Sequence, residues 1–447
     1  MTSPKTPMKV TILDGSLKAD STANRVQKSI LEILKGQGWQ VEHILIREKK
    51  IGHCARDFFC WVRNPGVCII DDDNRLIAES IANSHLLVLL TPITFGGYNS
   101  TLKRAVDHMI QNISPFFTQI NGETHHQKRY QNYPDFLAIG WMDKPDAQVE
   151  SIFRTLTWRN ALNFHAEKAA TSILLASQTD QEIDAILRHN LVNMPNLTDM
   201  QPLQLTQTKE PTLPPSKTKN AVLLVGSPRN QKSTSHALGS TLFEQLDKHN
   251  IATQNIYIYT SIRSSDRIQA MLDAVNAADL VVLSFPLYVD SLPAPTIEAL
   301  EIIAASRSSK MTSQRFTAIA NCGFPEPHHN AAALAICKTF AHQAGFLWAG
   351  SLSLGAGQGM VHGTPLDELG GRAVPLKKAL TSAVDALASG QPIPKEAQAL
   401  WDKPFIPGWL YRTMGQFGWR QQAKKYGTEK QLNQRVYVKE VFPKIGK

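Results

Sequence analysis

One sequence pattern occurs twice in this chain. A β-rich run closes at Gly15-Ser16 and again at Gly226-Ser227, and each copy continues with a loop bearing Lys or Arg, a Ser-Thr pair and a helical pattern. Further on, apolar runs that end in Pro lie at residues 86–92 and 280–286. An internal repeat of this kind predicts one folding unit used twice. The 447 residues leave room for two such units and little more.

Each copy alternates near-continuous apolar strands with amphipathic segments. Strands buried on both faces, with helices between them, predict a parallel, doubly wound α/β sheet. Five strands per copy favour the flavodoxin-like order 2-1-3-4-5. The expected fold is therefore two tandem three-layer α/β/α domains. The predicted strands are 9–14, 41–46, 85–91, 135–140 and 171–176 in the first copy, and 220–225, 252–258, 279–285, 316–321 and 349–354 in the second.

The predicted domains are residues 8–200 and 220–395, with a linker at 201–219 and a C-terminal arm at 396–447. The linker holds four prolines and no aromatic residue, so it cannot join a core. The arm carries ten Lys/Arg against four acids, a net +6 of the chain's +9, interleaved with Trp and Tyr. We interpret it as an arm that packs on a domain or a partner; contact with a membrane surface is the alternative. Its prolines and glycines predict against one long helix.

Composition excludes several classes of protein. No apolar run approaches the roughly 20 residues that a membrane span needs, and the N-terminus lacks the apolar core of a signal peptide. Five cysteines, an odd number, do not make a disulfide scaffold. Charge outside the arm is nearly balanced, so no nucleic-acid surface is expected. We therefore predict a cytoplasmic chain without a membrane span.

The loop after the first strand of each copy predicts a phosphate site. It places hydroxyls, backbone N–H groups and cations at a helix N-terminus, which favours a phosphate dianion. Simple helix capping is the alternative, but the recurrence favours phosphate. Neither a P-loop nor a Gly-x-Gly-x-x-Gly follows either strand. The candidate residues are Ser16, Lys18, Ser21, Thr22, Ala23 and Asn24 in the first copy, and Ser227, Arg229, Ser233, Thr234 and Ser235 in the second.

The loop after the third strand of each copy predicts a site for a planar ring. Pro ends the strand, and apolar and aromatic residues with exposed backbone amides follow it. Opposite a phosphate loop, such a segment suits a flat phosphorylated cofactor, hence FMN. The candidate residues are Pro92, Ile93, Thr94, Phe95 and Gly96 in the first copy, and Pro286, Leu287, Tyr288 and Val289 in the second.

Together these loops resemble those of the flavodoxin-like NAD(P)H-dependent FMN reductases. The run 321–325 is similar to that family's loop after the fourth strand, which adds Asn321 and Gly323 to the expected cofactor site. The resemblance implies that a hydride passes from NAD(P)H to bound FMN and on to a small acceptor such as a flavin or a quinone. It implies no dedicated catalytic side chain. Because single-domain relatives pair with flavin at their interface, we expect the two halves to pair as an intramolecular pseudo-dimer.

Three alternatives remain open on sequence. A flavodoxin-like electron carrier would be acidic, whereas this chain is basic. An electron-transfer iron–sulfur flavoprotein is the second alternative. In the third, one half has lost its flavin and serves as a scaffold. In that case the first copy is the half expected to lack flavin, because it has Leu17 where the family has Pro and Thr94 where the family has an aromatic residue.

A cysteine segment, residues 54–68, lies in the insertion of the first copy. Cys54, Cys60 and Cys68 resemble the cysteine motif of iron–sulfur flavoproteins, with Asp57 where the second cysteine stands. Since clusters are normally held by four thiolates, we interpret the segment as a loop over the flavin face, and predict no metal site. The histidine pairs at 125–126 and 328–329 lack metal-ligand spacing and are expected on exposed loops.

Overall fold

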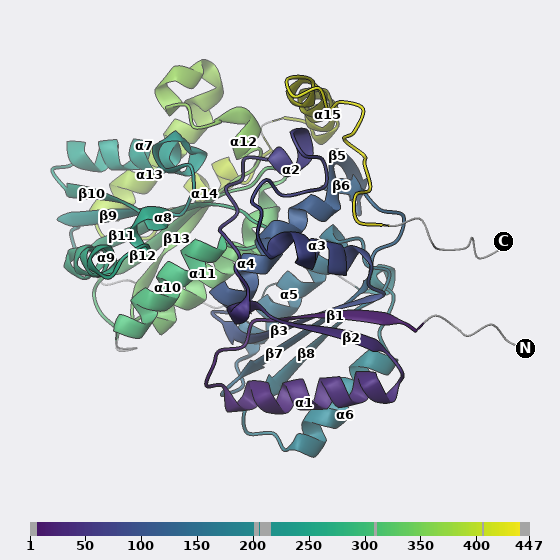
Figure 1. Ribbon diagram of the computed structural model, residues 1–447. Coiled ribbons are helices and arrows are strands. Elements are labelled where there is room, and N and C mark those ends of the chain that lie inside the picture. Colours follow the sequence, from purple (N-terminus) through teal and green to yellow (C-terminus); the bar gives the residue numbers. More distant parts are fainter. Residues whose placement is uncertain (1–6, 201–204, 206–215, 308–310, 405, 439–447) are drawn as a thin grey trace, which may run out of the picture.

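The computed structural model describes residues 7–200, 205, 216–307, 311–404 and 406–438. Two α/β/α units lie against each other, and the C-terminal helix α15 (Gly408–Lys424) lies near α2 and the strands β5 and β6 (Figure 1). Most of the predicted linker, and the last nine residues of the predicted arm, fall outside the described residues.

The first unit is built on a parallel sheet in the order β2-β1-β3-β7-β8, and a short β4 pairs antiparallel with the end of β3. In order along the chain, its five central strands take the predicted order 2-1-3-4-5. These strands are β1 (Lys9–Asp14), β2 (Gln40–Leu45), β3 (Leu86–Thr94), β7 (Asp135–Met142) and β8 (Ala169–Leu175), and β4 spans Gly97–Tyr98. The helices are α1 (Ser21–Gly36), α2 (Phe59–Val62), α3 (Asn74–Ala82), α4 (Ser100–His108), α5 (Ala147–Asn163) and α6 (Asp180–Val192), with the short turns η1 (Ile46–Glu48), η2 (Met109–Asn112) and η3 (Leu197–Asp199).

The second unit repeats this plan, with the parallel order β10-β9-β11-β12-β13. Its strands are β9 (Asn220–Val225), β10 (Ala252–Tyr257), β11 (Leu280–Pro286), β12 (Arg315–Asn321) and β13 (Leu347–Leu354). Its helices are α7 (Thr234–Lys248), α8 (Ile258–Ser261), α9 (Ser265–Ala277), α10 (Ala294–Ser306), α11 (Ala331–Gln343), α12 (Gly357–Met360) and α13 (Val374–Ala388), with η4 (Asn230–Lys232), η5 (Pro327–Asn330) and η6 (Leu366–Ala373). The predicted fold is confirmed in both copies.

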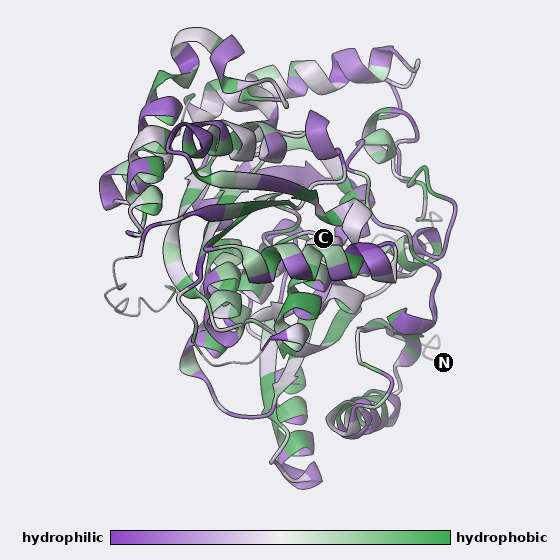
Figure 2. Ribbon diagram, turned by 90° about the vertical axis from the view of Figure 1, so that its left-hand side faces the viewer, coloured by the Kyte–Doolittle hydropathy of each residue, from purple (hydrophilic) through white to green (hydrophobic). Residues whose placement is uncertain are grey.

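Three apolar clusters explain why the strands are buried on both faces. One packs α1 and α6 on the outer face of the first sheet, and another packs α7, α13 and α14 (Lys395–Trp401) on the outer face of the second. The third and largest runs from the inner face of one sheet to the inner face of the other, through α4 and α5 on one side and α10 and α11 on the other. The helices alternate hydrophilic and hydrophobic residues along their length, as one-sided burial requires (Figure 2). The two halves therefore share one core.

A hairpin interrupts the repeat. The antiparallel strands β5 (Ile113–Ile120) and β6 (Glu123–Lys128) stand between α4 and β7, outside the main sheet. The sequence analysis did not predict them. Strand β6 is polar throughout and carries the histidine pair, so no alternation indicated a strand there, and β5 lost the partner that would have indicated a hairpin.

The arm joins the two halves. Helix α14 packs against α13, and its Trp401 is fully buried in the second unit. Helix α15 then crosses to the first unit, where it contacts β5 and α2. It is one continuous helix through Gly415 and Gly418, contrary to the prediction from its glycines. Beyond it, Arg129 donates to the carbonyls of Leu432 and Gln434 at 3.0 Å.

Among the described residues, no helix is both long and apolar enough to cross a membrane.

Candidate functional site

Two adjoining cavities open at the carboxyl ends of the strands of the second sheet, with volumes of about 160 and 590 Å³. The smaller is lined by the loops after β11 and β12, and the larger reaches Arg229 in the loop after β9. The cysteine segment, the hairpin and α15 close the other side. The residues common to both cavities are Arg56, Phe58, Phe117, Gln358, Tyr411 and Trp419. The site therefore belongs to the second sheet but is completed by the first half and the arm.

The phosphate loop of the second half approaches the neighbouring helix closely. A Cβ on Gly226 would lie 2.6 Å from the hydroxyl of Thr296, so only glycine fits. Ser233 is the N-cap of α7 and accepts from the N–H of His236 at 3.0 Å. Thr234 and Ser235 form the first turn of α7, where backbone N–H groups have no partner within the helix. Ser227 is buried beside them, and Arg229 reaches the larger cavity.

The ring loop of the second half holds an uncommon backbone conformation. Val289 and Asp290 have φ of 48° and 55°, a region that a β-branched residue rarely adopts. Side chains of the first half hold this loop in place. Lys103 donates to the Tyr288 carbonyl at 2.9 Å, and Asn160 donates to the Val289 carbonyl at 3.1 Å. The loop is thus shaped by the other half of the chain.

The side chains that fix the ring loop take part in buried ion pairs. Lys103 bonds Asp107 one turn along α4, and the Asp107 carboxylate accepts from the N–H of Ala294 at 2.8 Å. Arg159 donates to Asp290 at 2.8 Å. Burial would raise the pKa of Asp290, but the charge of Arg159 outweighs it and holds this pKa well below its usual range. Sequence reasoning did not predict these contacts, because Lys103 and Tyr288 are 185 positions apart and Arg159 and Asp290 are 131 positions apart.

The loop after β12 ties the site together. The Asn321 amide donates to the hydroxyl of Ser235 and to the Phe285 carbonyl, both at 3.0 Å. The Gly323 carbonyl accepts a hydrogen bond from Tyr411 of α15. Gly323 itself faces the cavity, where Arg56 is the nearest group to its missing side chain. The structure therefore brings the second-copy candidate residues to one end of the sheet.

The equivalent phosphate loop of the first half is closed by its own side chains. The Ser16 hydroxyl accepts from Arg47 at 2.7 Å and from Gln27 at 2.9 Å. Asp14, which ends β1 as Val225 ends β9, accepts from the Ser16 N–H at 2.8 Å. The N-cap of α1 is Asp20, where α7 has Ser233. Two carboxylates thus stand in this loop, and Ser21, Asn24 and Lys18 are left exposed on its outer side.

The first ring loop is a tight hairpin between β3 and β4. Phe95 packs edge-on against Phe340 of α11, with ring centroids 5.3 Å apart. A Cβ on Gly96 would lie 2.9 Å from Ile152, and one on Gly97 would lie 2.8 Å from Ile336. Helices α5 and α11 therefore pack tightly on the turn at Phe95 and Gly96, whereas Pro92, Ile93 and Thr94 remain partly exposed.

Comparison with protein families agrees with the repeat. The model of the NADPH-dependent FMN reductase family matches residues 8–151 and again 220–359, well over half of the chain. The chain belongs to this family. The two matched segments coincide with the two flavodoxin-like halves of the structure.

Individual relatives of the family cover smaller parts of the chain. An iron–sulfur flavoprotein of Methanosarcina thermophila is 25% identical over 103 residues, which are 23% of this chain and 53% of that protein. One of Archaeoglobus fulgidus is also 25% identical, over 23% of this chain and 46% of its own. The chain spans about half the length of these curated relatives.

The solved structures to which the chain is similar include two reductases. The FMN-dependent NADH-azoreductase of Bacillus anthracis, in complex with FMN, is 12% identical with a TM-score of 0.31, over 38% of this chain and 100% of that one. The NAD(P)H:quinone oxidoreductase of Methanothermobacter marburgensis is 12% identical with a TM-score of 0.26, over 31% of this chain and 87% of that one.

The cysteine segment does not fit the cluster in the names of these relatives. Cys54, Cys60 and Cys68 line one cavity of about 20 Å³. Burial raises the pKa of all three thiols, to about 12 for Cys54, so they are protonated at neutral pH. Asp57 uses its carboxylate to accept from the Phe59 N–H at 2.9 Å. Three thiols and an engaged carboxylate fall short of the four cysteine ligands that a cluster normally has.

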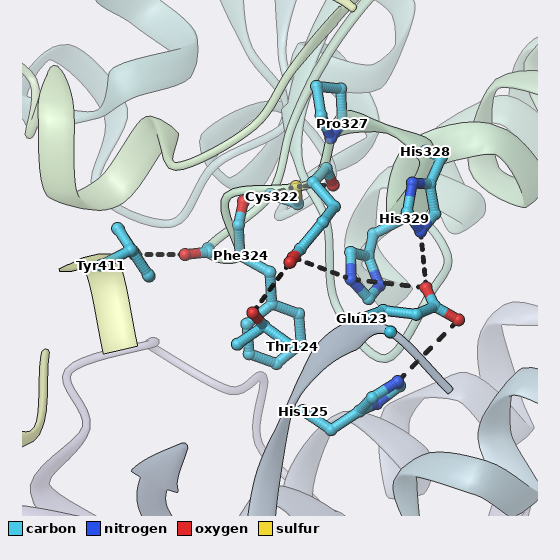
Figure 3. Close-up of polar contacts among 12 residues, drawn as sticks. Glu123, Thr124, His125, Cys322, Phe324, Pro327, His328, His329 and Tyr411 are labelled. Atoms are coloured by element: carbon cyan, nitrogen blue, oxygen red, sulfur yellow. Dashed lines mark hydrogen bonds and ion pairs between the residues drawn. The ribbon is translucent and has the colours of Figure 1, made fainter. Parts of the chain in front are cut away.

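The histidine pairs lie at the interface of the two halves, and two of the four histidines are fully buried rather than exposed. His125 of β6 and His329 of η5 have side chains about 1% exposed, and His328 is 56% exposed. Glu123 lies between them (Figure 3). The expectation of exposed loop histidines was wrong, because η5 packs against the unpredicted hairpin.

Proposed function

We propose that the second half binds one FMN, that the first half binds none, and that the chain is an NAD(P)H-dependent oxidoreductase acting on a small flat acceptor such as a flavin or a quinone. The proposal combines the family with the cavities at the end of the second sheet.

The difference in charge between the two phosphate loops is the observation that assigns FMN to the second half. A phosphate dianion at a helix N-terminus is stabilised by unpaired N–H groups and by cations, and it is repelled by carboxylates. The second loop presents Arg229 and the first turn of α7, and no acidic residue lies between Gly226 and Ser235. The first loop holds Asp14 and Asp20, and its cation Arg47 is already engaged by Ser16. We therefore assign the phosphate to Ser227, Arg229, Ser233, Thr234 and Ser235.

The chain's own residues provide the place for the ring. Pro286, Leu287, Tyr288 and Val289 would border it on one side and the loop from Asn321 to Gly323 on another, with backbone groups available for hydrogen bonds. Aromatic side chains from the first half and from α15 line the opposite wall and exclude water from it. A bound FMN supplies the redox chemistry, accepting a hydride from a nicotinamide and passing electrons to the acceptor. An aromatic wall of this kind suits a planar acceptor.

The experiment measures the flavin content of the purified full chain together with its oxidation of NADPH. We expect one FMN per chain and rapid NADPH oxidation in the presence of a quinone. Loss of the guanidinium in Arg229→Ala should weaken FMN binding about tenfold or more, roughly 1.4 kcal/mol, because it removes a charge-assisted contact with the phosphate. Lys18→Ala, at the corresponding place in the first half, is the matched control and should bind FMN as the wild type does.

Different outcomes separate the alternatives. Two FMN per chain, or an equal loss of affinity in Lys18→Ala, would contradict the assignment to the second half. Flavin that NADPH does not reduce would indicate an electron carrier. Stoichiometric iron and sulfide after anaerobic purification would restore the iron–sulfur alternative.

A further inference from the structure

A cluster of histidines and carboxylates lies beside the cavity, where the hairpin of the first half meets η5 of the second (Figure 3). The Glu123 carboxylate lies 2.6 Å from His328 Nε2 and 3.7 Å from His329 Nε2. One donor atom from each of these three residues lies within 4.8 Å of the others. His125 Nε2 approaches the same carboxylate at 4.0 Å, and Glu326 approaches His329 Nε2 at 3.5 Å.

The hydrogen bonds of Asn163 determine which nitrogen of His125 carries its proton. The Asp290 carboxylate can only accept, so Asn163 must direct its NH₂ group toward it. The Asn163 carbonyl oxygen then faces His125 Nδ1 at 2.8 Å, and Nδ1 must be the protonated nitrogen. His125 Nε2 is left with a lone pair that is buried, has no hydrogen-bond partner and faces the Glu123 carboxylate. Two acceptors facing each other in a buried place need a cation between them.

The charges of the cluster point the same way. Glu123, Glu326 and Asp290 bring three carboxylates to one place, and Arg159 is the guanidinium that faces them. With neutral imidazoles, two negative charges are left over in a largely buried site. Arg159 donates to His329 Nδ1 at 2.5 Å, so His329 carries its proton on Nε2, which faces Glu326 and Glu123 and is not a free lone pair.

We propose that Glu123, His125 and His328 bind a divalent metal ion, best matched by Zn²⁺, that joins the two halves of the chain. Imidazole nitrogen and carboxylate oxygen are the donor set that Zn²⁺ prefers. A divalent ion balances the two excess charges. His125 would bind the ion through its Nε2 lone pair, while its Nδ1 proton stays on the Asn163 carbonyl oxygen, a hydrogen bond of the kind that orients a metal-bound histidine. Arg159 keeps its bond to Asp290 through Nε.

Neither histidine pair has metal-ligand spacing in sequence. Glu123 and His328 are 205 positions apart and meet only because the halves pack together. The proposed ion is independent of the flavin assignment, since its ligands hold no part of the phosphate or ring loops.

The test is Zn²⁺ binding to the full chain after treatment with a chelator, followed by calorimetry with Zn²⁺ alone and by visible absorption with Co²⁺. We expect one ion per chain and the d–d bands of Co²⁺ in a site with nitrogen and oxygen ligands. Because His328 is an exposed ligand, His328→Ala should leave the fold intact and weaken Zn²⁺ binding about tenfold or more. Glu123→Gln should do the same. His189→Ala, an exposed histidine on α6, is the control and should bind as the wild type does.

Absence of Zn²⁺ uptake, or equal binding by His328→Ala and His189→Ala, overturns the proposal. The cluster is then an ion-pair network in which protonated imidazoles balance the carboxylates. Flavin content, measured on the same samples, reports separately on the proposed FMN site.

Discussion

Single residues make the two copies of one loop chemically different. Asp14 occupies the place that Val225 has in the second half, and Asp20 caps its helix where Ser233 caps the other. Asp14 is fully buried and bonds His43 at 2.7 Å. Asp14 at the end of β1, together with His43, therefore fills the first loop with internal hydrogen bonds.

Replacing His43 by Ala tests this network. Burial raises the pKa of Asp14, but hydrogen bonds with His43 and Ser16 outweigh it, so this pKa lies below 3.8 in the folded chain. The stabilisation is therefore complete above that value and is lost as the pH falls through the folded pKa. We expect His43→Ala to lower the free energy of unfolding by about 1–3 kcal/mol at neutral pH, because a buried carboxylate loses its partner.

Urea denaturation of wild type and variant, at neutral pH and at an acid pH below the folded pKa of Asp14, measures the effect. The difference should shrink at the lower pH, once Asp14 is protonated in both proteins. His189→Ala controls for the loss of a histidine elsewhere. A difference of equal size at both pH values would show that Asp14 is not the group involved.

At the scale of elements, α15 depends on a glycine for its position over the cavity. Gly415 contacts Phe117 of β5 so closely that a Cβ would lie 2.2 Å from the ring. Tyr411 and Trp419, one turn to either side of it, line the cavity. Gly418, on the same helix, has nothing within 4 Å of its missing side chain. The two glycines thus form a matched pair.

Gly415→Ala should lower the free energy of unfolding by about 1–3 kcal/mol, because the methyl group forces α15 away from β5. Gly418→Ala should raise it by roughly 0.5–1 kcal/mol, as alanine favours a helix. Thermal unfolding measures both changes, and Trp419 fluorescence reports on the position of the helix. Equal behaviour of the two variants would contradict the packing of α15 on the hairpin.

At the scale of the whole molecule, each half completes the other. The central core is continuous between the two sheets, and the first half supplies Lys103, Arg159 and Asn160 to hold the ring loop of the second. The first half therefore acts as a scaffold in the proposed enzyme. This arrangement is the intramolecular pairing that the sequence analysis expected.

Lys103→Met tests the dependence of one half on the other. It leaves Asp107 buried without its partner, which should cost about 3–5 kcal/mol, and it frees the Tyr288 carbonyl. We expect weaker FMN binding although Lys103 lies in the half without flavin. The double variant Lys103→Met, Asp107→Leu should regain part of the stability, since it removes the unpaired charge.

Lys28→Met, on the exposed face of α1, is the control. FMN titration and urea denaturation of the full chain measure both effects. Unchanged FMN affinity in Lys103→Met would mean that the ring loop keeps its shape without the first half.

Much of the fold could be read from the sequence because its signals are local. Apolar runs, helical periodicity and the Gly-Ser turns lie within a few residues of one another, and they predicted all ten central strands and their order. The hairpin β5–β6 was missed because the polar residues of β6 carry no such signal. The glycines of α15 wrongly predicted a break in the helix. Gly415 is there because α15 packs closely on Phe117, a contact that the local sequence does not show.

The sequence by itself determined two parallel sheets, the loops at their carboxyl ends and the family of cofactor that such loops suit. The proposal that only the second copy holds the cofactor rests on the tertiary structure, because Asp14 is buried and α5 and α11 pack on the turn at Phe95 and Gly96. The same holds for Lys103 beside Tyr288, 185 positions away, and for Glu123 beside His328. Contacts at such separations follow from how two surfaces pack, and no local pattern in the chain encodes them.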